Sequence, residues 1–210
     1  MFTDTLPKEA QHALVLLGQN TCLPPDTYLA RGSALALHFG HRISVDFDFF
    51  TPKSFNSEKI ALDLAKIGKF EADTIIKDTL LGSFEKTRFS LFRYVYPLLF
   101  PTNHFSDILL ADPRDIAAMK LAAIMDRGTK KDFVDLYFIL KQVASMEDCL
   151  KFYDKKYQAL SNNIYSIITS LSYFTDAHIT EMPKMLKLTN WSDVEKFFTD
   201  LSIKLAKKYL

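Results

Sequence analysis

Cysteine and glycine are scarce in this sequence of 210 residues, and neither sign of charge is in excess. The two cysteines, Cys22 and Cys149, lie far apart and belong to no CxxC or CxxH spacing. This argues against a thiolate zinc site and against a disulfide framework. The formal net charge of +1 argues against a polycation that binds nucleic acid by bulk charge, although a local basic patch stays compatible with it.

Long hydrophobic runs are also missing. The most apolar segments, residues 94–100 and 116–125, are too short to span a bilayer, and the second contains Lys120. The first ten residues lack a basic region followed by an apolar stretch, so no signal peptide is expected. We therefore expect a cytoplasmic protein without a membrane segment.

The chain nevertheless has ample material for a core, because 48% of its residues are hydrophobic and only 24% are charged. Strands are expected at 27–30, 42–50, 74–85 and 87–94, and helices at 6–20, 33–39, 57–66, 112–127, 131–143 and beyond 147. The pattern predicts an α+β protein with two domains: a mixed α/β part over residues 1–110 and an all-helical part over 111–210.

Residues 42–50 carry the first candidate site. Their alternation predicts an apolar face with Val45, Phe47 and Phe49, and a polar face with Ser44, Asp46 and Asp48. Carboxylates at i and i+2 of one strand lie about 6–7 Å apart at their Cα atoms, close enough to share a Mg²⁺ ion. Asp-x-Asp is a common pattern, however, and on its own it is more typical of a solvated strand face.

A second feature lies 14 residues before Asp46, where Gly32 and Ser33 stand at a strand-to-helix turn. Glycine lets the backbone approach a phosphate, a serine hydroxyl can donate to it, and the first N–H groups of a helix favour an anion. Together the two features describe a triphosphate held by a turn, with its metal on the adjacent strand. This combination favours nucleotidyl transfer.

The third feature is Lys120, which small and apolar residues surround in a predicted helix. Such a lysine either extends to solvent or places its charge on a phosphate. Asp132 and Asp135 follow at i and i+3 on the next helix, on one face. They either anchor Lys120 or Arg127, or act as acids in the site.

These blocks resemble the signature of the AbiEii/AbiGii-type nucleotidyltransferase toxins, in the DNA polymerase β-like nucleotidyltransferase superfamily. The resemblance covers about residues 25–142 and rests on four segments: 31–37, 40–50, 92–99 and 115–137. It implies a polymerase β-like core, with a twisted mixed sheet flanked by helices, and a helical C-terminal domain that contributes Lys120 and Asp135 to the site. It also implies a Mg²⁺-dependent toxin that transfers a nucleotide from an NTP to tRNA and is restrained by an antitoxin.

The resemblance also implies roles for individual residues. Gly32 and Ser33, with Arg42 and Ser44 beside them, correspond to the triphosphate-binding part, and Asp46 and Asp48 to the metal ligands. Ser44 matches a position that partner-directed phosphorylation targets in some relatives. Lys120 corresponds to a phosphate-holding lysine, Asp135 to a late essential acid, and Asp132 to a second candidate for that acid.

One position departs from the pattern of the superfamily. Many polymerase β-like enzymes carry a third metal-binding carboxylate on a neighbouring strand, and here Ser90 stands where that acid is expected. Glu85, Asp132 or Asp135 are the candidates to replace it. Two alternatives therefore stay open: transfer to a protein or small molecule, and a degenerate domain that binds nucleotide without turnover. The sequence does not predict an oligomeric state.

Overall fold

The computed structural model describes residues 1–210 and forms two compact units, Met1–Asp112 and Pro113–Leu210. The first unit contains a short 3-10 helix η1 (Thr3–Thr5), three α-helices and seven strands. The helices are α1 (Lys8–Gln19), α2 (Arg31–Phe39) and α3 (Ser57–Ile67). The strands are β1 (Tyr28–Leu29), β2 (Asp46–Thr51), β3 (Phe70–Ile76), β4 (Thr79–Phe84), β5 (Thr87–Arg93), β6 (Asn103–Phe105) and β7 (Ile108–Leu110).

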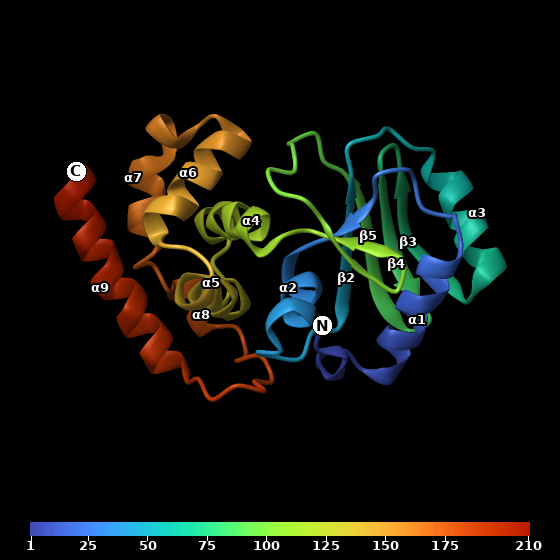
Figure 1. Ribbon diagram of the computed structural model, residues 1–210, viewed down its shortest axis with the longest axis horizontal. Helices are drawn as coiled ribbons and strands as arrows, with labels where there is room; N and C mark the ends of the chain where they lie inside the picture. Colours follow the sequence, from blue (N-terminus) through green and yellow to red (C-terminus); the bar gives the residue numbers. More distant parts are fainter. The chain divides into compact units, whose positions relative to one another are not determined.

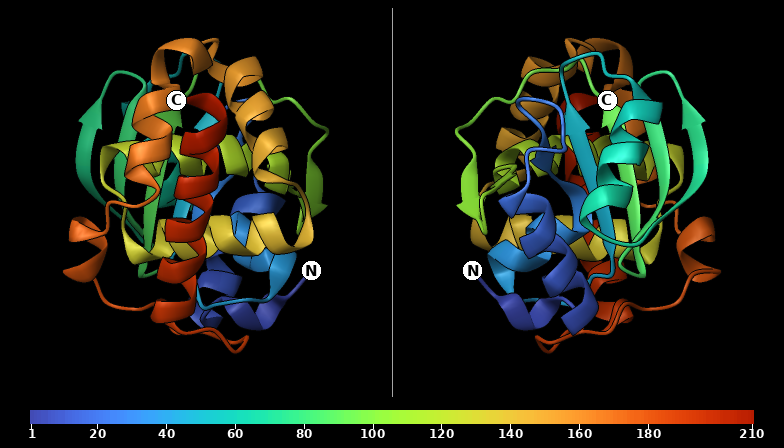
Figure 2. Two further views of the ribbon diagram at one scale, coloured as in Figure 1. Left: turned by 90° about the vertical axis from the view of Figure 1, so that its left-hand side faces the viewer. Right: turned by 90° about the vertical axis from the view of Figure 1, so that its right-hand side faces the viewer.

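The seven strands form one mixed sheet in the order β3-β4-β5-β2-β1-β7-β6. The β2–β5 and β1–β7 pairs are parallel and the others are antiparallel. Helices α1 and α3 lie on one face of the sheet and α2 lies on the other (Figures 1 and 2). The expected mixed sheet flanked by helices is confirmed.

Alternation along β2 separates the core from the polar face. Phe47 and Phe49 are fully buried and contact each other with ring centroids 6.0 Å apart, and Phe89 of β5 lies 5.5 Å from Phe49. Burying each aromatic ring contributes about 2–3 kcal/mol to folding. The prediction for Val45 is wrong: it is 46% exposed, because β2 begins only at Asp46 and the alternation does not extend to earlier residues.

The single strand expected over residues 74–85 is also wrong. The segment contains the end of β3, a turn at Lys77 and Asp78, and β4. Asp78 adopts the left-handed backbone region at φ 61°, and its carboxylate accepts hydrogen bonds from the Ser54 hydroxyl and the Phe55 N–H, both at 2.8 Å. Aspartate tolerates this conformation, so the chain reverses without a glycine to signal the turn.

The second unit contains the helices α4 (Pro113–Asp126), α5 (Lys130–Gln142), α6 (Met146–Tyr157), α7 (Leu160–Ser170), α8 (Thr175–His178) and α9 (Trp191–Tyr209). The expectation of helix throughout the segment beyond 147 is wrong for residues 179–190, which are irregular. Helix α4 packs against α5, α6 and α7 (Figure 1). It agrees with the helix expected over residues 112–127, and it is followed by Gly128 at φ 40°. None of the helices is long and apolar enough to cross a membrane.

Candidate active site

The turn that opens α2 is fastened to the strand that carries the paired carboxylates. The Ser33 hydroxyl donates a hydrogen bond to the backbone carbonyl of Asp46 and lies 2.9 Å from the Ser44 hydroxyl. One residue before α2, the Ala30 N–H donates to the carbonyl of Asp48 at 3.0 Å. The Gly-Ser turn and the Asp-x-Asp strand therefore form one local structure, in which both serine hydroxyls are buried.

Gly32 is required by a close approach rather than by its dihedral angles. A Cβ atom at this position would lie 2.5 Å from Nη2 of Arg42 and 3.2 Å from Oγ of Ser44. Arg42 is only 2% exposed, and its Nη1 donates to the carbonyl of Ile43 at 3.0 Å. Because the guanidinium lies against the bare backbone of Gly32, a larger residue would push the turn and Arg42 apart.

Asp46 and Asp48 share the face of the sheet opposite the phenylalanine core, and both are partly exposed. Arg31, which opens α2, reaches this face: its Nη1 lies 3.3 Å from Oδ1 of Asp48. Its guanidinium carbon lies 5.2 Å from the centroid of the Phe50 ring, at cation–π distance. The sequence did not predict the pairing of Arg31 with Asp48, because the two residues are 17 positions apart.

The parallel register of β2 and β5 places Ser90 directly beside Asp48, and the exposed Arg88 beside Asp46. Ser90 thus occupies the place on the neighbouring strand where a third carboxylate was expected. Glu85 is wrong as its replacement. It lies in the β4–β5 turn at φ 49°, about 16 Å along the strand from Ser90, and accepts a hydrogen bond from the Lys69 N–H at 2.6 Å.

In the helical unit, Lys120 lies between two carboxylates. Its Nζ is 2.9 Å from Oδ1 of Asp132 and 2.7 Å from Oδ2 of Asp135, and all three residues are at most 5% exposed. Both acids thus anchor Lys120. Arg127 lies farther away, with its Nε 3.9 Å from Oδ2 of Asp132.

Asp132 has a second structural task at the start of α5. Its Oδ2 accepts hydrogen bonds from the hydroxyl of Thr129 at 2.6 Å and from the Thr129 N–H at 3.3 Å, which completes a capping box. Burial acts to raise the pKa of Asp132, but the Lys120 charge and these hydrogen bonds outweigh it and hold the pKa below its usual range. Asp132 is therefore a charged anchor.

A model of the nucleotidyl transferase AbiEii toxin family, type IV toxin–antitoxin system, matches residues 92–204. This chain belongs to that family. The AbiEii match also covers more than half of the chain, including Lys120, Asp132 and Asp135. An uncharacterized protein of Aquifex aeolicus (strain VF5), aq_aa25, is 38% identical over 208 residues, which are 97% of this chain and 95% of that protein. As an AbiEii protein, the chain is a nucleotidyltransferase, and its toxin–antitoxin family implies an antitoxin partner.

Solved structures share the fold of this AbiEii chain. The nucleotidyltransferase toxin MenT4 of Mycobacterium tuberculosis H37Rv superposes with a TM-score of 0.61 at 15% identity, covering 94% of this chain and 84% of MenT4. JHP933 of Helicobacter pylori superposes with a TM-score of 0.56 at 17% identity, covering 97% of this chain and 94% of JHP933. The expected α+β nucleotidyltransferase fold is thus confirmed.

The donor set of this AbiEii chain fits a magnesium ion that arrives with a nucleotide. Mg²⁺ is commonly bound by one or two carboxylates together with waters and substrate phosphates, rather than by a cage of protein ligands. Asp46 and Asp48 supply two carboxylates on one strand face, and the structure contains no group of three or more His, Cys, Asp or Glu side chains arranged for a metal. The residues therefore suit Mg²⁺ with a triphosphate better than a metal held by protein alone.

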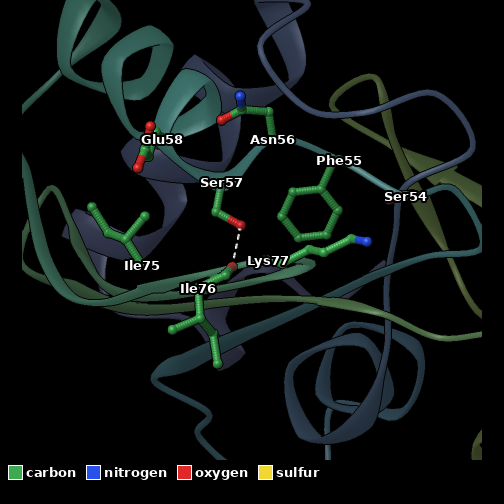
Figure 3. A pocket seen from close by; sticks show the side chains of 8 residues that line it. All are labelled: Ser54, Phe55, Asn56, Ser57, Glu58, Ile75, Ile76 and Lys77. Carbon is green, nitrogen blue, oxygen red and sulfur yellow. Dashed lines mark hydrogen bonds between the residues drawn. The ribbon is translucent and has the colours of Figure 1, made fainter.

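A pocket of about 580 Å³ lies in the first unit between α3 and the edge strand β3 (Figure 3). Ser57 and Ile76 meet in it, where the Ser57 hydroxyl donates to the Ile76 carbonyl at 2.6 Å. None of the residues that line it belongs to the Gly-Ser turn or to β2. This pocket is therefore separate from the turn and from the strand that carries Asp46 and Asp48.

Proposed function

We propose that this chain is a Mg²⁺-dependent toxin that transfers a nucleoside monophosphate from an NTP to the 3′ end of tRNA, and that a cognate antitoxin restrains it. The observation that carries the proposal is the attachment of the Gly-Ser turn to β2 through the Ser33 hydroxyl and the Asp46 carbonyl. It brings the N-terminus of a helix next to paired carboxylates, the combination that a metal-bound triphosphate needs.

In this proposal the turn and the strand divide the work. The N–H groups that open α2 at Gly32 and Ser33 hold the triphosphate, with Arg42 and Ser44 supporting the turn from behind. Asp46 and Asp48 are the metal ligands. Mg²⁺, when bound, supplies Lewis-acid polarisation of the phosphoryl oxygens and charge for the departing pyrophosphate. The attacking tRNA hydroxyl forms a bond to the α-phosphorus as the bond to pyrophosphate breaks.

The helical unit contributes the remaining roles. Lys120 is assigned to the phosphates, to which its ammonium would supply a point charge. Asp135 is assigned as the acid that receives the proton of the attacking hydroxyl. Both acids pair with Lys120, but Asp132 is the weaker candidate for that role, because the Thr129 hydroxyl and N–H also bind its carboxylate.

A polyanionic acceptor is supported by the basic side chains of the β2 face. Arg88 is exposed and stands beside Asp46 in the ladder, and Arg31 is 38% exposed beside Asp48. Cations next to a metal site favour a substrate that brings many phosphates, because each neutralised phosphate releases counterions. On this ground we favour tRNA over a small-molecule acceptor.

The test is transfer of label from each of the four α-³²P-labelled NTPs, with Mg²⁺, onto total tRNA, total protein and the chain itself. Label on tRNA that depends on Mg²⁺ is expected and would name the nucleotide. Label on protein alone would support nucleotidyl transfer but show that the acceptor is a protein rather than tRNA. Binding of NTP without label on any acceptor would replace the proposal by a domain that binds nucleotide without turnover.

A further inference from the structure

The ion pair between Arg31 and Asp48 places a positive charge beside a proposed metal ligand. The distance from Nη1 to Oδ1 is 3.3 Å, and the guanidinium carbon lies 5.2 Å from the centroid of the Phe50 ring. The fork of a guanidinium can bind a carboxylate while its flat face packs on an aromatic ring. These two contacts position the Arg31 side chain when no ligand is bound.

The backbone of Arg31 also shows that its position is imposed. Its φ of 55° lies in the left-handed region, which costs a residue with a Cβ about 1 kcal/mol or more. The next residue is Gly32, and the preceding N–H of Ala30 is bonded to the Asp48 carbonyl at 3.0 Å. Strain of this kind persists where the surroundings hold it, and here the turn directs the side chain at Asp48.

The acids of the site are sufficient for one metal ion. On the face that holds Asp46 and Asp48, the neighbouring β5 offers only Arg88, Ser90 and Phe92. Asp135, the proposed late acid, already lies 2.7 Å from Nζ of Lys120. A second ion would need carboxylate ligands that this face does not provide.

We propose that the site takes one divalent cation, and that Arg31 supplies the second positive charge, which in a two-metal site would come from the other ion. In the absence of nucleotide, Arg31 holds the Asp48 carboxylate. With a metal-bound triphosphate in the site, Asp48 would hold the metal and the Arg31 guanidinium would turn to a phosphate oxygen, for which its fork is equally suited. Arg31 is therefore both a competitor of the metal for Asp48 and a ligand of the nucleotide. The inference rests on the proposed function, since it assumes that a nucleotide binds at the turn.

The competition gives the Arg31→Ala variant two effects of opposite sign. Mn²⁺ alone is expected to bind at least as tightly as in the wild type, because Asp48 loses its ion pair. The unreactive α,β-methylene analogues of the four ribonucleoside triphosphates, each tested in turn with Mn²⁺, are expected to bind about ten- to a hundredfold more weakly. A merely structural role of Arg31 would weaken both.

Arg93→Ala is the matched control. Arg93 lies in the same unit, is 43% exposed, and pairs with Asp78 at 3.5 Å, but it lies on the other face of the sheet. This variant is expected to leave both affinities unchanged.

The experiment is a titration of the chain with Mn²⁺, with and without the analogue, in which electron paramagnetic resonance counts the free ion. One bound Mn²⁺ per chain is expected for the wild type with analogue, and two for Ser90→Asp, which adds a carboxylate beside Asp48. Two ions in the wild type, one in Ser90→Asp, or parallel losses in Arg31→Ala would overturn the inference and leave the proposed function standing. Failure of the wild type to bind any analogue would overturn both.

Discussion

Nζ of Lys156 in α6 lies 2.8 Å from Oδ1 of Asp115 in α4, and both side chains are completely shielded from solvent. Asp115 stands one residue after Arg114 in the first turn of the helix that carries Lys120. The pair therefore fastens the helix of a proposed site residue to its neighbour. A buried pair of this kind is costly to break, because removing one partner leaves the other charge buried.

Lys156→Met is expected to lower the free energy of unfolding by about 3–5 kcal/mol, as urea denaturation will measure. Replacing both partners, as Asp115→Leu with Lys156→Met, should recover most of the loss, because no buried charge remains. Lys151→Met on the same helix is the control: its pair with Asp148 is exposed and worth at most about 1 kcal/mol. Equal losses in Lys156→Met and Lys151→Met would contradict this account.

Asp135 and Asp132 should differ in their effect on transfer. Asp135→Asn is expected to lower the rate by about a hundredfold or more, the usual effect of losing a group that moves a proton. Asp132→Asn should retain far more activity and instead destabilise the start of α5, because the Thr129 cap is weakened. Single-turnover rates and thermal unfolding of both variants distinguish the two roles, and a larger rate loss in Asp132→Asn would reverse the assignment.

The lowered pKa of Asp132 makes stability depend on acidity. Its folded-state pKa lies below the ordinary value of 3.8, so its contribution is fully present above 3.8 and is lost as the pH falls through the folded-state pKa. As the pH is lowered below 3.8, the urea midpoint of the wild type should therefore decrease, and it should decrease more steeply than the urea midpoint of Asp132→Asn. Parallel curves for the two proteins would show that Asp132 contributes nothing to acid unfolding.

Gly32→Ala tests the close packing behind the turn. The new Cβ would lie 2.5 Å from Nη2 of the buried Arg42, and overpacking of this kind costs about 1–3 kcal/mol. We expect a folded but destabilised protein that binds the triphosphate analogue more weakly, because the turn moves off β2. Unchanged affinity in this variant would mean that the position of the turn does not matter for the nucleotide.

Local patterns predict a large part of this structure. Helix α2 is capped by Gly40, which adopts φ 63°, and Asp46 and Asp48 alternate with buried phenylalanines. Both features depend on residues close in sequence. The sequence also indicated that the strand containing Ser90 neighbours the strand containing Asp48, and the parallel pairing of β2 with β5 agrees with this.

Local sequence patterns do not predict contacts between residues that are far apart in the sequence. The pairing of Arg31 with Asp48 depends on how α2 returns to the sheet, and the pairing of Lys120 with Asp132 and Asp135 on how α4 packs against α5. Glu85 was a candidate acid because it lies close in sequence to the strand with Ser90. The register of β4 and β5 places it in the turn between them, away from Asp46 and Asp48. The action of Lys120 and Asp135 together with Asp46 is part of the proposed function, and mutation tests it.

The most direct test of the central claim is transfer of α-³²P label to tRNA by the wild type, Asp46→Asn and Asp63→Asn. Asp63 lies in the same unit as Asp46, and its lysine partners, Lys59 and Lys66, are on its own helix α3. The account predicts Mg²⁺-dependent label for the wild type and Asp63→Asn, and none above background for a folded Asp46→Asn. Undiminished transfer by Asp46→Asn would contradict the assignment of the active site to the turn and β2.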